Sequence, residues 1–380
     1  MNSRDLYNQR MMNAFGDPQL VIDHGQGVYV FDQDGKRYLD LAAGSGANAL
    51  GYSHPAVVAA INEQARKVIH VSNLFATTPQ VDLAGAIQSM LSAEGYVGAS
   101  ARVFFCNSGT EANEAAIKVA LMHKPRGTII ALKSGFHGRT LGSLSITFQP
   151  AIREPFEPLP SNVLFIDPTV EALEAAFDDD VAAIFVQTIE GEAGVEPLNE
   201  EFIRRARGLS ERYNALLVID EIHTGIGRTG RWFAHSGLAK ADLVTISRGL
   251  GGGVPIGAVI GIDKAGKIMT PGSHSTTFGG NPLVCAAANA VVKETDRLLE
   301  QVLSTGEWLR GELHARGFDV RGEGLLLGIM VKDAPALQAE LLARGYIVTA
   351  PTPTMIRLSP PLIITQRELT PFLEEMEAII

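Results

Sequence analysis

Short, almost continuously apolar runs separated by longer segments with helical spacing dominate the sequence between residues 101 and 247. Runs of this kind are typical of parallel strands whose two faces are both covered by helices. We therefore predict an α/β fold in which helices cover a mostly parallel sheet. The runs include ARVFFC (101–106), GTIIAL (127–132), AAIFVQ (182–187), ALLVID (215–220) and LVTIS (243–247).

The sequence changes character on either side of this region. Apolar positions alternate around the turn Gln33-Asp34-Gly35, which predicts a hairpin. Near Asn281-Pro282 long helical spacing begins, and short strands return in residues 320–331 and 354–364. A chain of 380 residues is too long for one simple core. We expect a large domain at 51–281 and a smaller α+β domain at 282–380, which an N-terminal segment at 1–50 joins.

Composition argues against several classes of partner. The net charge is -10, and no cluster of Lys and Arg suits a nucleic-acid backbone. No stretch of 18 apolar residues and no signal-peptide core appear, so we expect a cytoplasmic protein without a membrane partner. Cys106 and Cys285 lack metal-ligand spacing, so we expect two buried thiols and no metal site.

The polar segments that follow the predicted strands are the candidate ligand site, because such sheets bind ligands at the carboxyl ends of their strands. Ser108, Gly109 and Thr110 follow the first run and open a helix. Backbone N–H groups there favour an anion, although an ordinary capped helix has the same residues. Phe136, His137 and Arg139 follow the second run, and this arginine suits either a carboxylate or solvent.

Two further strand ends carry charge. Asp220 closes the run 215–220, where a buried acid requires a cationic partner such as a protonated pyridine nitrogen. Arg248 follows the run 243–247 and begins a glycine-rich segment that allows close backbone approach.

Taken together, these segments resemble the class III aminotransferases, most closely the acetylornithine/ornithine aminotransferase branch, from the hairpin near residue 26 to Ile364. The resemblance implies a fold-type I pyridoxal-phosphate enzyme and a homodimer with shared active sites. The matching segments are RYLDLAAGSGANALGYSHPAV, FFCNSGTEANEAAIKVA, FHGRTLG, GEAGV, VIDEIHTGIGRTGRWFAH, RGLGGGVPIGA, TTFGGNPL and IRLSPPL.

The resemblance also implies roles for individual residues. The cofactor phosphate would lie at the helix start, one aromatic ring would stack on the pyridine, and an acid would keep its nitrogen protonated as an electron sink. Arg139 resembles the family's carboxylate-binding arginine, while Glu192 and Arg357 resemble a paired gate that admits either an ω-amine or an α-amino acid. The implied cofactor-binding residues are Ser108, Gly109, Thr110, Phe136, Asp220, Ile222, His223 and, from a partner subunit, Thr277.

The chain departs from this family at the position of the Schiff-base lysine, where it has Arg248. Lys240 precedes the strand, and Lys264 and Lys267 lie well beyond it. Arginine stays protonated and cannot form the bond that this lysine makes. The substitution is compatible with natural divergence, which we favour, and with an engineered Lys to Arg replacement.

His223 is a second departure, because the family has a glutamine that contacts the cofactor's phenolic oxygen. Its imidazole would either serve as the missing acid/base or be a polar residue satisfied by neighbouring backbone. A third departure is Gln187-Thr188-Ile189-Glu190, where the family reads Glu-Pro-Ile-Gln.

Three hypotheses follow from Arg248. The first is an enzyme that binds pyridoxal or pyridoxamine 5'-phosphate non-covalently and acts on an ornithine-like amine or an N-acyl amino acid. The second is a non-catalytic subunit that regulates or pairs with an active homologue. The third is a Lys to Arg variant of an ordinary acetylornithine-type aminotransferase.

Overall fold

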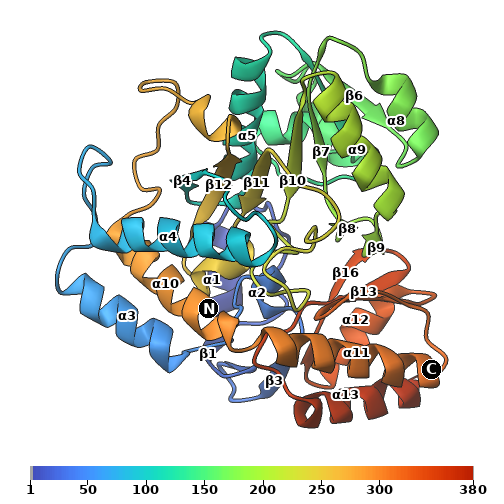
Figure 1. Ribbon diagram of the computed structural model, residues 1–380. Coiled ribbons are helices and arrows are strands. Elements are labelled where there is room, and N and C mark those ends of the chain that lie inside the picture. The colour runs from blue at the N-terminus through green and yellow to red at the C-terminus, as the bar shows by residue number, and fades with distance from the viewer. Residues whose placement is uncertain (1–2, 380) are drawn as a thin grey trace.

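The computed structural model describes residues 3–379 and is built around one seven-stranded sheet (Figure 1). Five of its strands form a parallel block, and β12 runs antiparallel to both of its neighbours. The mostly parallel sheet that the apolar runs predict is confirmed. In spatial order the strands are β4 (Ala101–Cys106), β12 (Gly257–Ile262), β11 (Leu243–Ile246), β10 (Leu216–Asp220), β7 (Val181–Val186), β5 (Thr128–Leu132) and β6 (Val163–Ile166).

Helices cover both faces of this sheet, which explains why its central strands are apolar throughout. On one face α5 (Gly109–His123) packs through small residues such as Ala115, Ala116 and Ala120, so that the helix lies close to the strands. On the other face lie α4 (Thr78–Ala93) and α9 (Glu200–Arg212), whose Phe202 and Ile203 are fully buried. Every residue of β7 and β10 is buried between these layers.

A second core joins the two ends of the chain. The predicted hairpin is confirmed as β2 (Tyr29–Asp32) and β3 (Arg37–Asp40), which pair antiparallel next to β1 (Ile22–Gln26). The C-terminal strand β15 (Tyr346–Ile347) adds to the edge of β3. Leu39 and Leu41 therefore share one apolar cluster with Leu309 and Phe372.

The rest of this region forms an antiparallel sheet with helices on it (Figure 1). The strand order is β13 (Val320–Glu323), β14 (Leu326–Met330), β17 (Met355–Leu358) and β16 (Thr349–Thr352). The helices are α11 (Leu299–Ala315), α12 (Ala334–Ala343) and α13 (Gln366–Ile379). These elements place β17 opposite the carboxyl end of the large sheet, where Arg357 reaches Glu192.

The remaining elements connect these bodies. Asn281 caps α10 (Pro282–Asp296) by accepting a hydrogen bond from the backbone N–H of Val284. Pro282 follows at the first helical position, where an N–H would have no helical partner. The other elements are α1 (Ser3–Arg10), α2 (Ala43–Gly46), α3 (Pro55–Ala65), α6 (Leu141–Ser145), α7 (Pro150–Arg153), η1 (Glu154–Phe156), α8 (Val170–Ala176), β8 (Ile189–Glu190), β9 (Glu196–Pro197), η2 (Arg248–Gly251), η3 (Ala265–Lys267) and α10 (Pro282–Asp296).

Two long loops project from the same side of the molecule (Figure 1). One lies between α3 and α4 and the other between η3 and α10. The side chain of Asn73 donates to the carbonyl oxygens of Thr276 and Gly279, at 3.1 Å each, and so ties the loops together. Large apolar side chains on them are exposed, including Leu74 at 88%, Phe75 at 66% and Phe278 at 60%.

Candidate functional site

A cavity of about 300 Å³ lies where β5, β10 and β11 end. It brings together side chains from the segments that follow these strands, which are far apart in the sequence. The lining residues are Gly109, Thr110, Phe136, His137, Gly138, Arg139, Gln187, Gly191, Glu192, Asp220, Ile222, His223 and Arg248. Ser108 and Thr277 are not among them, and Arg357 contacts the cavity through Glu192 and Gly191.

The start of α5 forms one wall of this cavity. Ser108 caps the helix and accepts a hydrogen bond from the backbone N–H of Glu111, while Glu111 accepts one from the backbone N–H of Asn107 at 2.6 Å. Gly109 and Thr110 follow at the helix start. A Cβ atom on Gly109 would lie 2.7 Å from the side chain of Ile222, so the close approach requires glycine.

Asp220 lies at the end of β10 and is 1% exposed. Its Oδ2 accepts a hydrogen bond from the Asn113 amide at 2.9 Å and lies 2.7 Å from Nδ1 of His137. Its Oδ1 accepts from the backbone N–H of Ile222 at 3.0 Å. A buried carboxylate requires such donors, because an isolated charge in the protein interior is strongly destabilising.

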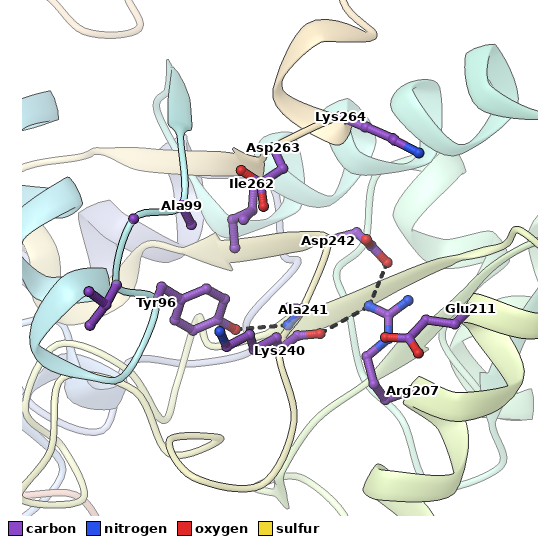
Figure 2. Close-up of a pocket in the computed structure, with 12 residues that line it drawn as sticks. Tyr96, Ala99, Arg207, Glu211, Lys240, Ala241, Asp242, Ile262, Asp263 and Lys264 are labelled. Atoms are coloured by element: carbon purple, nitrogen blue, oxygen red, sulfur yellow. Dashed lines mark hydrogen bonds and ion pairs between the residues drawn. The ribbon is translucent and has the colours of Figure 1, made fainter.

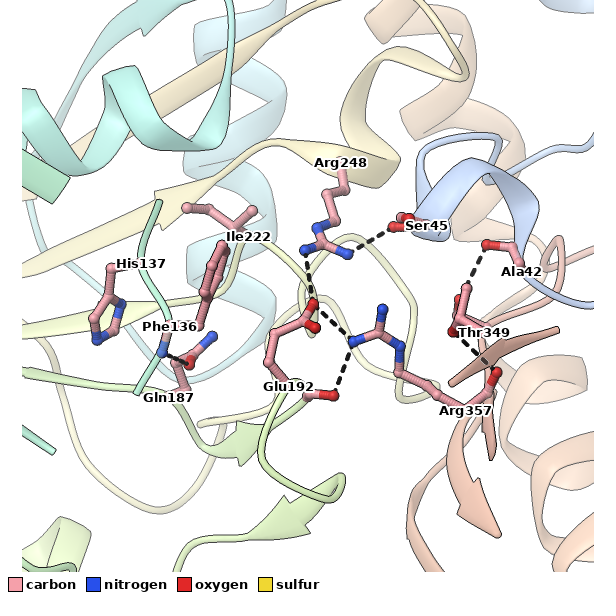
Figure 3. Close-up of polar contacts among 12 residues, drawn as sticks. Ala42, Ser45, Phe136, His137, Gln187, Glu192, Ile222, Arg248, Thr349 and Arg357 are labelled. Carbon is pink, nitrogen blue, oxygen red and sulfur yellow. Dashed lines mark hydrogen bonds and ion pairs between the residues drawn. The ribbon is translucent and has the colours of Figure 1, made fainter. Parts of the chain in front are cut away.

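Hydrogen bonds to side chains fix the backbone of the loop that carries Phe136. Gln187 accepts a hydrogen bond from the backbone N–H of Phe136 at 3.1 Å (Figure 3). The backbone N–H of His137 donates to the hydroxyl of Thr147 at 2.9 Å. No sequence pattern predicted the contact between the His137 ring and Asp220. Nearby Glu190 is almost fully buried, and burial raises its pKa.

On the opposite side of the cavity, Glu192 lies between two guanidinium groups (Figure 3). Its Oε1 accepts from Nη1 of Arg357 at 2.8 Å and lies 3.5 Å from Nη2 of Arg248. Burial opposes ionisation of Glu192, but the charges of Arg357 and Arg248 outweigh it and lower the pKa of the carboxyl. Arg248 also donates to the carbonyl oxygen of Ser45 at 2.9 Å.

His223 also lines the cavity and is 5% exposed. Burial, and then the positive charges of Arg248, Arg357 and Arg228, lower its pKa well below the ordinary value. The imidazole is therefore neutral at neutral pH, and its Nε2 has no hydrogen-bond partner. A Cβ on Gly191 would come within 2.7 Å of its Nδ1, so Gly191 makes room for the ring.

Arg228 acts on this site through its charge, which contributes to the lowered pKa of His223, and no sequence pattern singled it out. It is 3% exposed, and its Nη1 donates to the backbone oxygens of Leu325 and Pro360. Burial, together with the charge of Arg248, lowers its pKa to about 9.

A larger groove of about 490 Å³ lies near residue 242, just before β11 begins (Figure 2). Its charged side chains largely satisfy one another: Arg207 contacts Asp242 at 2.8 Å and Glu211 at 3.2 Å. Lys240 and Lys264 line this groove. Within residues 3–379, no lysine lines the cavity that holds Asp220.

Among the described residues, the structure gives no support for a metal site, a reactive thiol or a membrane-spanning helix. In the described part of the chain, no group of three His, Cys, Asp or Glu residues is placed to hold a metal ion. Burial raises the pKa of both Cys106 and Cys285 to about 12, so these thiols stay protonated. No helix between residues 3 and 379 has the length and apolar character to cross a membrane.

Comparison with known proteins adds a family. The family model described as Aminotransferase class-III matches residues 11–380. Acetylornithine aminotransferase of Mycobacterium tuberculosis is 44% identical over 388 residues, which cover 99% of this chain and 96% of that protein. The enzyme of the same name from Streptomyces clavuligerus is 42% identical, covering 97% of this chain and 93% of the relative.

Solved structures match nearly the full length of the chain. N-acetylornithine aminotransferase from Stenotrophomonas maltophilia has a TM-score of 0.83 and 32% identity, covering 98% of this chain and 97% of its own. Ornithine aminotransferase from Toxoplasma gondii, with partial occupancy of PLP at its active site, has a TM-score of 0.91 and 29% identity, covering 98% and 92%.

Proposed function

Because this chain belongs to the class-III aminotransferase family and has its fold-type I architecture, we propose that it binds pyridoxal or pyridoxamine 5'-phosphate without a covalent bond. Its substrate would be an ornithine-like amine or an N-acyl amino acid, as the names of its acetylornithine aminotransferase relatives suggest. The observation that carries the proposal is the convergence of Thr110, Phe136 and Asp220 on one cavity.

The residues present fit this cofactor. The cavity has the volume of a small-molecule site. A phosphate suits the start of α5, where Gly109 and Thr110 lie and Gly138 leaves the approach open, since a Cβ on Gly138 would overlap Thr110. Asp220 is a buried carboxylate that lines the cavity, and a protonated ring nitrogen would give it a cationic partner.

When bound, the cofactor supplies an electron sink for a substrate amine. The chain's own residues would hold and orient it. Gly109 and Thr110, preceded by Ser108, would hold the phosphate, and Phe136 and Ile222 would enclose the two faces of the ring. Asp220 would keep the ring nitrogen protonated, and His137 and Asn113 would hold Asp220 in place.

Arg139 and Arg357 would bind the substrate's carboxylates. Arg139 is exposed at the cavity rim, where its fork is free to bind an entering carboxylate. Arg357 is 4% exposed and is held by Glu192 and the carbonyl oxygen of Gly191. Movement of Glu192 away from Arg357 would open that second position.

Arg248 would stand where the family has its cofactor-binding lysine, because it follows β11 and lines the cavity. Burial and the charge of Arg357 lower its pKa, while Glu192 and Asp220 oppose that shift. A guanidinium still holds its proton in proteins and does not attack a carbonyl carbon. Ordinary transamination would then be slow, and neutral His223, with its free Nε2, is the candidate for moving a proton.

A homodimer is the assembly we propose. The two loops joined by Asn73 expose Leu74, Phe75 and Phe278, and a second copy would cover them. Thr277 lies on the same loop as Phe278 and is exposed, so it would reach the partner's site rather than its own.

We also propose that the chain divides into the large domain at 51–281 and the small domain at 282–380, joined by residues 1–50.

Two alternatives rest on Arg248. Arg248 donates to the carbonyl oxygen of Ser45 and pairs with Glu192, and these contacts would suit a non-catalytic subunit that binds the ligand and regulates or pairs with an active homologue. A Lys to Arg variant of an ordinary acetylornithine-type aminotransferase would instead recover rapid transfer between an ω-amine and 2-oxoglutarate in Arg248→Lys.

Absorption spectroscopy of the purified protein with pyridoxal phosphate tests the main proposal. We expect a bound band that shifts when an amine is added, and no cofactor adduct on the protein by intact mass after borohydride reduction. A reducible adduct would contradict non-covalent binding. Absence of any bound band would contradict the proposed function and lead instead to a search for a protein partner.

A further inference from the structure

One carboxylate, that of Glu192, is shared by two guanidinium groups from different parts of the fold (Figure 3). Arg357 extends from β17, and Arg248 lies after β11 at the start of η2. The Arg357 contact is short, at 2.8 Å, whereas the Arg248 contact of 3.5 Å leaves room for the two groups to draw closer. Glu192 and Arg248 each keep 22% of their side chains exposed, so both have room to move.

Positive charge exceeds negative charge on this wall of the cavity. Arg228, Arg248 and Arg357 all act on the buried ring of His223. Glu192 is the carboxylate that pairs with two of them, whereas Asp220 is already bound by Asn113 and His137. The buried Nε of Arg357, next to this wall, also lacks a hydrogen-bond partner. Such a wall suits an additional anionic group.

We propose that Arg248 determines ligand choice in this site by retaining Glu192 when Arg357 turns to a ligand carboxylate, so that the site favours dicarboxylates over ligands with an ω-ammonium group. This inference rests on the proposed function for the cofactor and the identity of the site, and it replaces the ω-amine proposed there with a dicarboxylate as the favoured ligand. It assigns Arg248 a task of its own, in place of the covalent one that its family position implies.

The physical reason is the cost of opening the pair. If Glu192 had Arg357 as its only partner, freeing Arg357 for a ligand would leave a largely buried carboxylate unpaired, which is strongly unfavourable. With Arg248 beside it, Glu192 keeps a charged partner after Arg357 leaves. Arg248 thereby lowers the free energy needed to separate Arg357 from Glu192. A ligand with a second carboxylate can then bind Arg357 with a smaller penalty.

The same contact acts in the opposite direction on a cationic ligand. An ω-ammonium group entering this end of the cavity would pair with Glu192. Arg248 already neutralises part of that carboxylate's charge and repels a second cation at short range. Removing the charge of Arg248 should therefore weaken dicarboxylate binding and strengthen ω-ammonium binding, which a general loss of structure would not do.

Three five-carbon probes separate these effects: glutarate, pentanoate and 5-aminopentanoate. Calorimetric titration is done on the full chain loaded with pyridoxamine phosphate, which has no carbonyl to react with an amine, and repeated on cofactor-free protein. In Arg248→Gln we expect glutarate to bind about tenfold more weakly, pentanoate to change by less than about twofold, and 5-aminopentanoate to bind a few-fold more tightly. Lys264→Gln, in the separate groove, is the matched control and should change none of them.

A double-mutant cycle tests whether Arg248 acts through Glu192. In a Glu192→Gln background, Arg248→Gln should alter glutarate affinity by less than about twofold. An undiminished tenfold loss in that background, or an equal loss for all three probes, would overturn the proposal. Arg248→Lys keeps the charge without the planar fork and should recover part of the glutarate affinity.

The proposed function and this inference fail in different ways. Glutarate selectivity that depends on Arg248 in protein that binds no pyridoxal phosphate would contradict the proposed function and support the inference. Tight cofactor binding with equal affinity for glutarate and 5-aminopentanoate in both the unmodified protein and Arg248→Gln would support the function and contradict the inference.

Discussion

Nδ1 of His137 lies 2.7 Å from Oδ2 of Asp220, and each of these side chains is 1% exposed. The imidazole is one of three donors that stabilise this carboxylate, together with the Asn113 amide and the backbone N–H of Ile222. The carboxyl end of β10 thus presents a fixed negative charge to the cavity.

His137→Ala should remove one of these donors and leave Asp220 less well held. Loss of a hydrogen bond to a buried charged group costs roughly 2 kcal/mol. We expect the free energy of unfolding, measured in urea, to fall by about that amount, and pyridoxal phosphate to bind about tenfold more weakly. His24→Ala is the control, because its ion pair with Asp23 lies on the surface. Unchanged cofactor affinity in His137→Ala would argue against a role for Asp220 at the ring.

Gly109→Ala should close part of the cavity, since the added Cβ meets the side chain of Ile222 at 2.7 Å. Overpacking of this kind costs about 1–3 kcal/mol, and the displaced Ile222 would narrow the space for a ring. Gly85→Ala in α4 is a matched control, because nothing lies within 4 Å of its added Cβ. The control should stabilise the protein by about 0.5–1 kcal/mol. Thermal unfolding and a cofactor titration measure both effects, and equal cofactor affinity in the two variants would count against the site.

Periodicity predicted the parallel strands that are buried on both faces. The run 215–220 corresponds to β10, and 182–187 to β7, because each strand is apolar throughout and lies between two layers of helices. In contrast, β12 was not predicted. It begins at Gly257 and includes Gly261, and its antiparallel place between β4 and β11 depends on tertiary pairing.

Site residues were predictable where a local sequence pattern places them at a strand end. Contacts between residues far apart in the sequence were not predictable. Gly109, Phe136 and Asp220 follow apolar runs, so their positions at one sheet edge follow from the fold. The bond between Arg248 and the carbonyl oxygen of Ser45 spans 203 residues, and no local spacing encodes it. The same is true of Arg228 and its contacts with Leu325 and Pro360. The roles of the individual site residues stay predictions.

Glu192→Gln should change how stability depends on pH. The pKa of Glu192 is lowered in the folded protein, so the carboxylate stabilises the fold above its unfolded-state pKa of about 4.5. That contribution is lost as the pH falls through the lower folded-state value. The difference in unfolding free energy between the unmodified protein and the variant, roughly 2 kcal/mol for a charge-assisted bond, should be constant above pH 5 and should narrow below about pH 4. A gap that is independent of pH down to the lowest measurable value would mean that the glutamate is not held as a charged partner.

His223→Gln should remove a loss of stability that the unmodified protein suffers in mild acid. The pKa of His223 is lowered well below 6.5 by burial and by three nearby arginines, so below pH 6.5 the unfolded chain takes up a proton that the folded chain does not. Each pH unit below 6.5, down to the folded-state pKa, lowers the unfolding free energy by about 1.4 kcal/mol. Above pH 6.5 the unfolding free energies of the two proteins should change in parallel. Urea unfolding at pH 7.5, 6.5 and 5.5 measures the difference. If the unfolding free energies of the two proteins change in parallel across the whole range, the imidazole has an ordinary pKa. It would then be mostly protonated below pH 6.5 and unable to accept a proton. The expected divergence would instead mean that the imidazole is neutral in the folded protein in mild acid, which is the charge state required for accepting a proton.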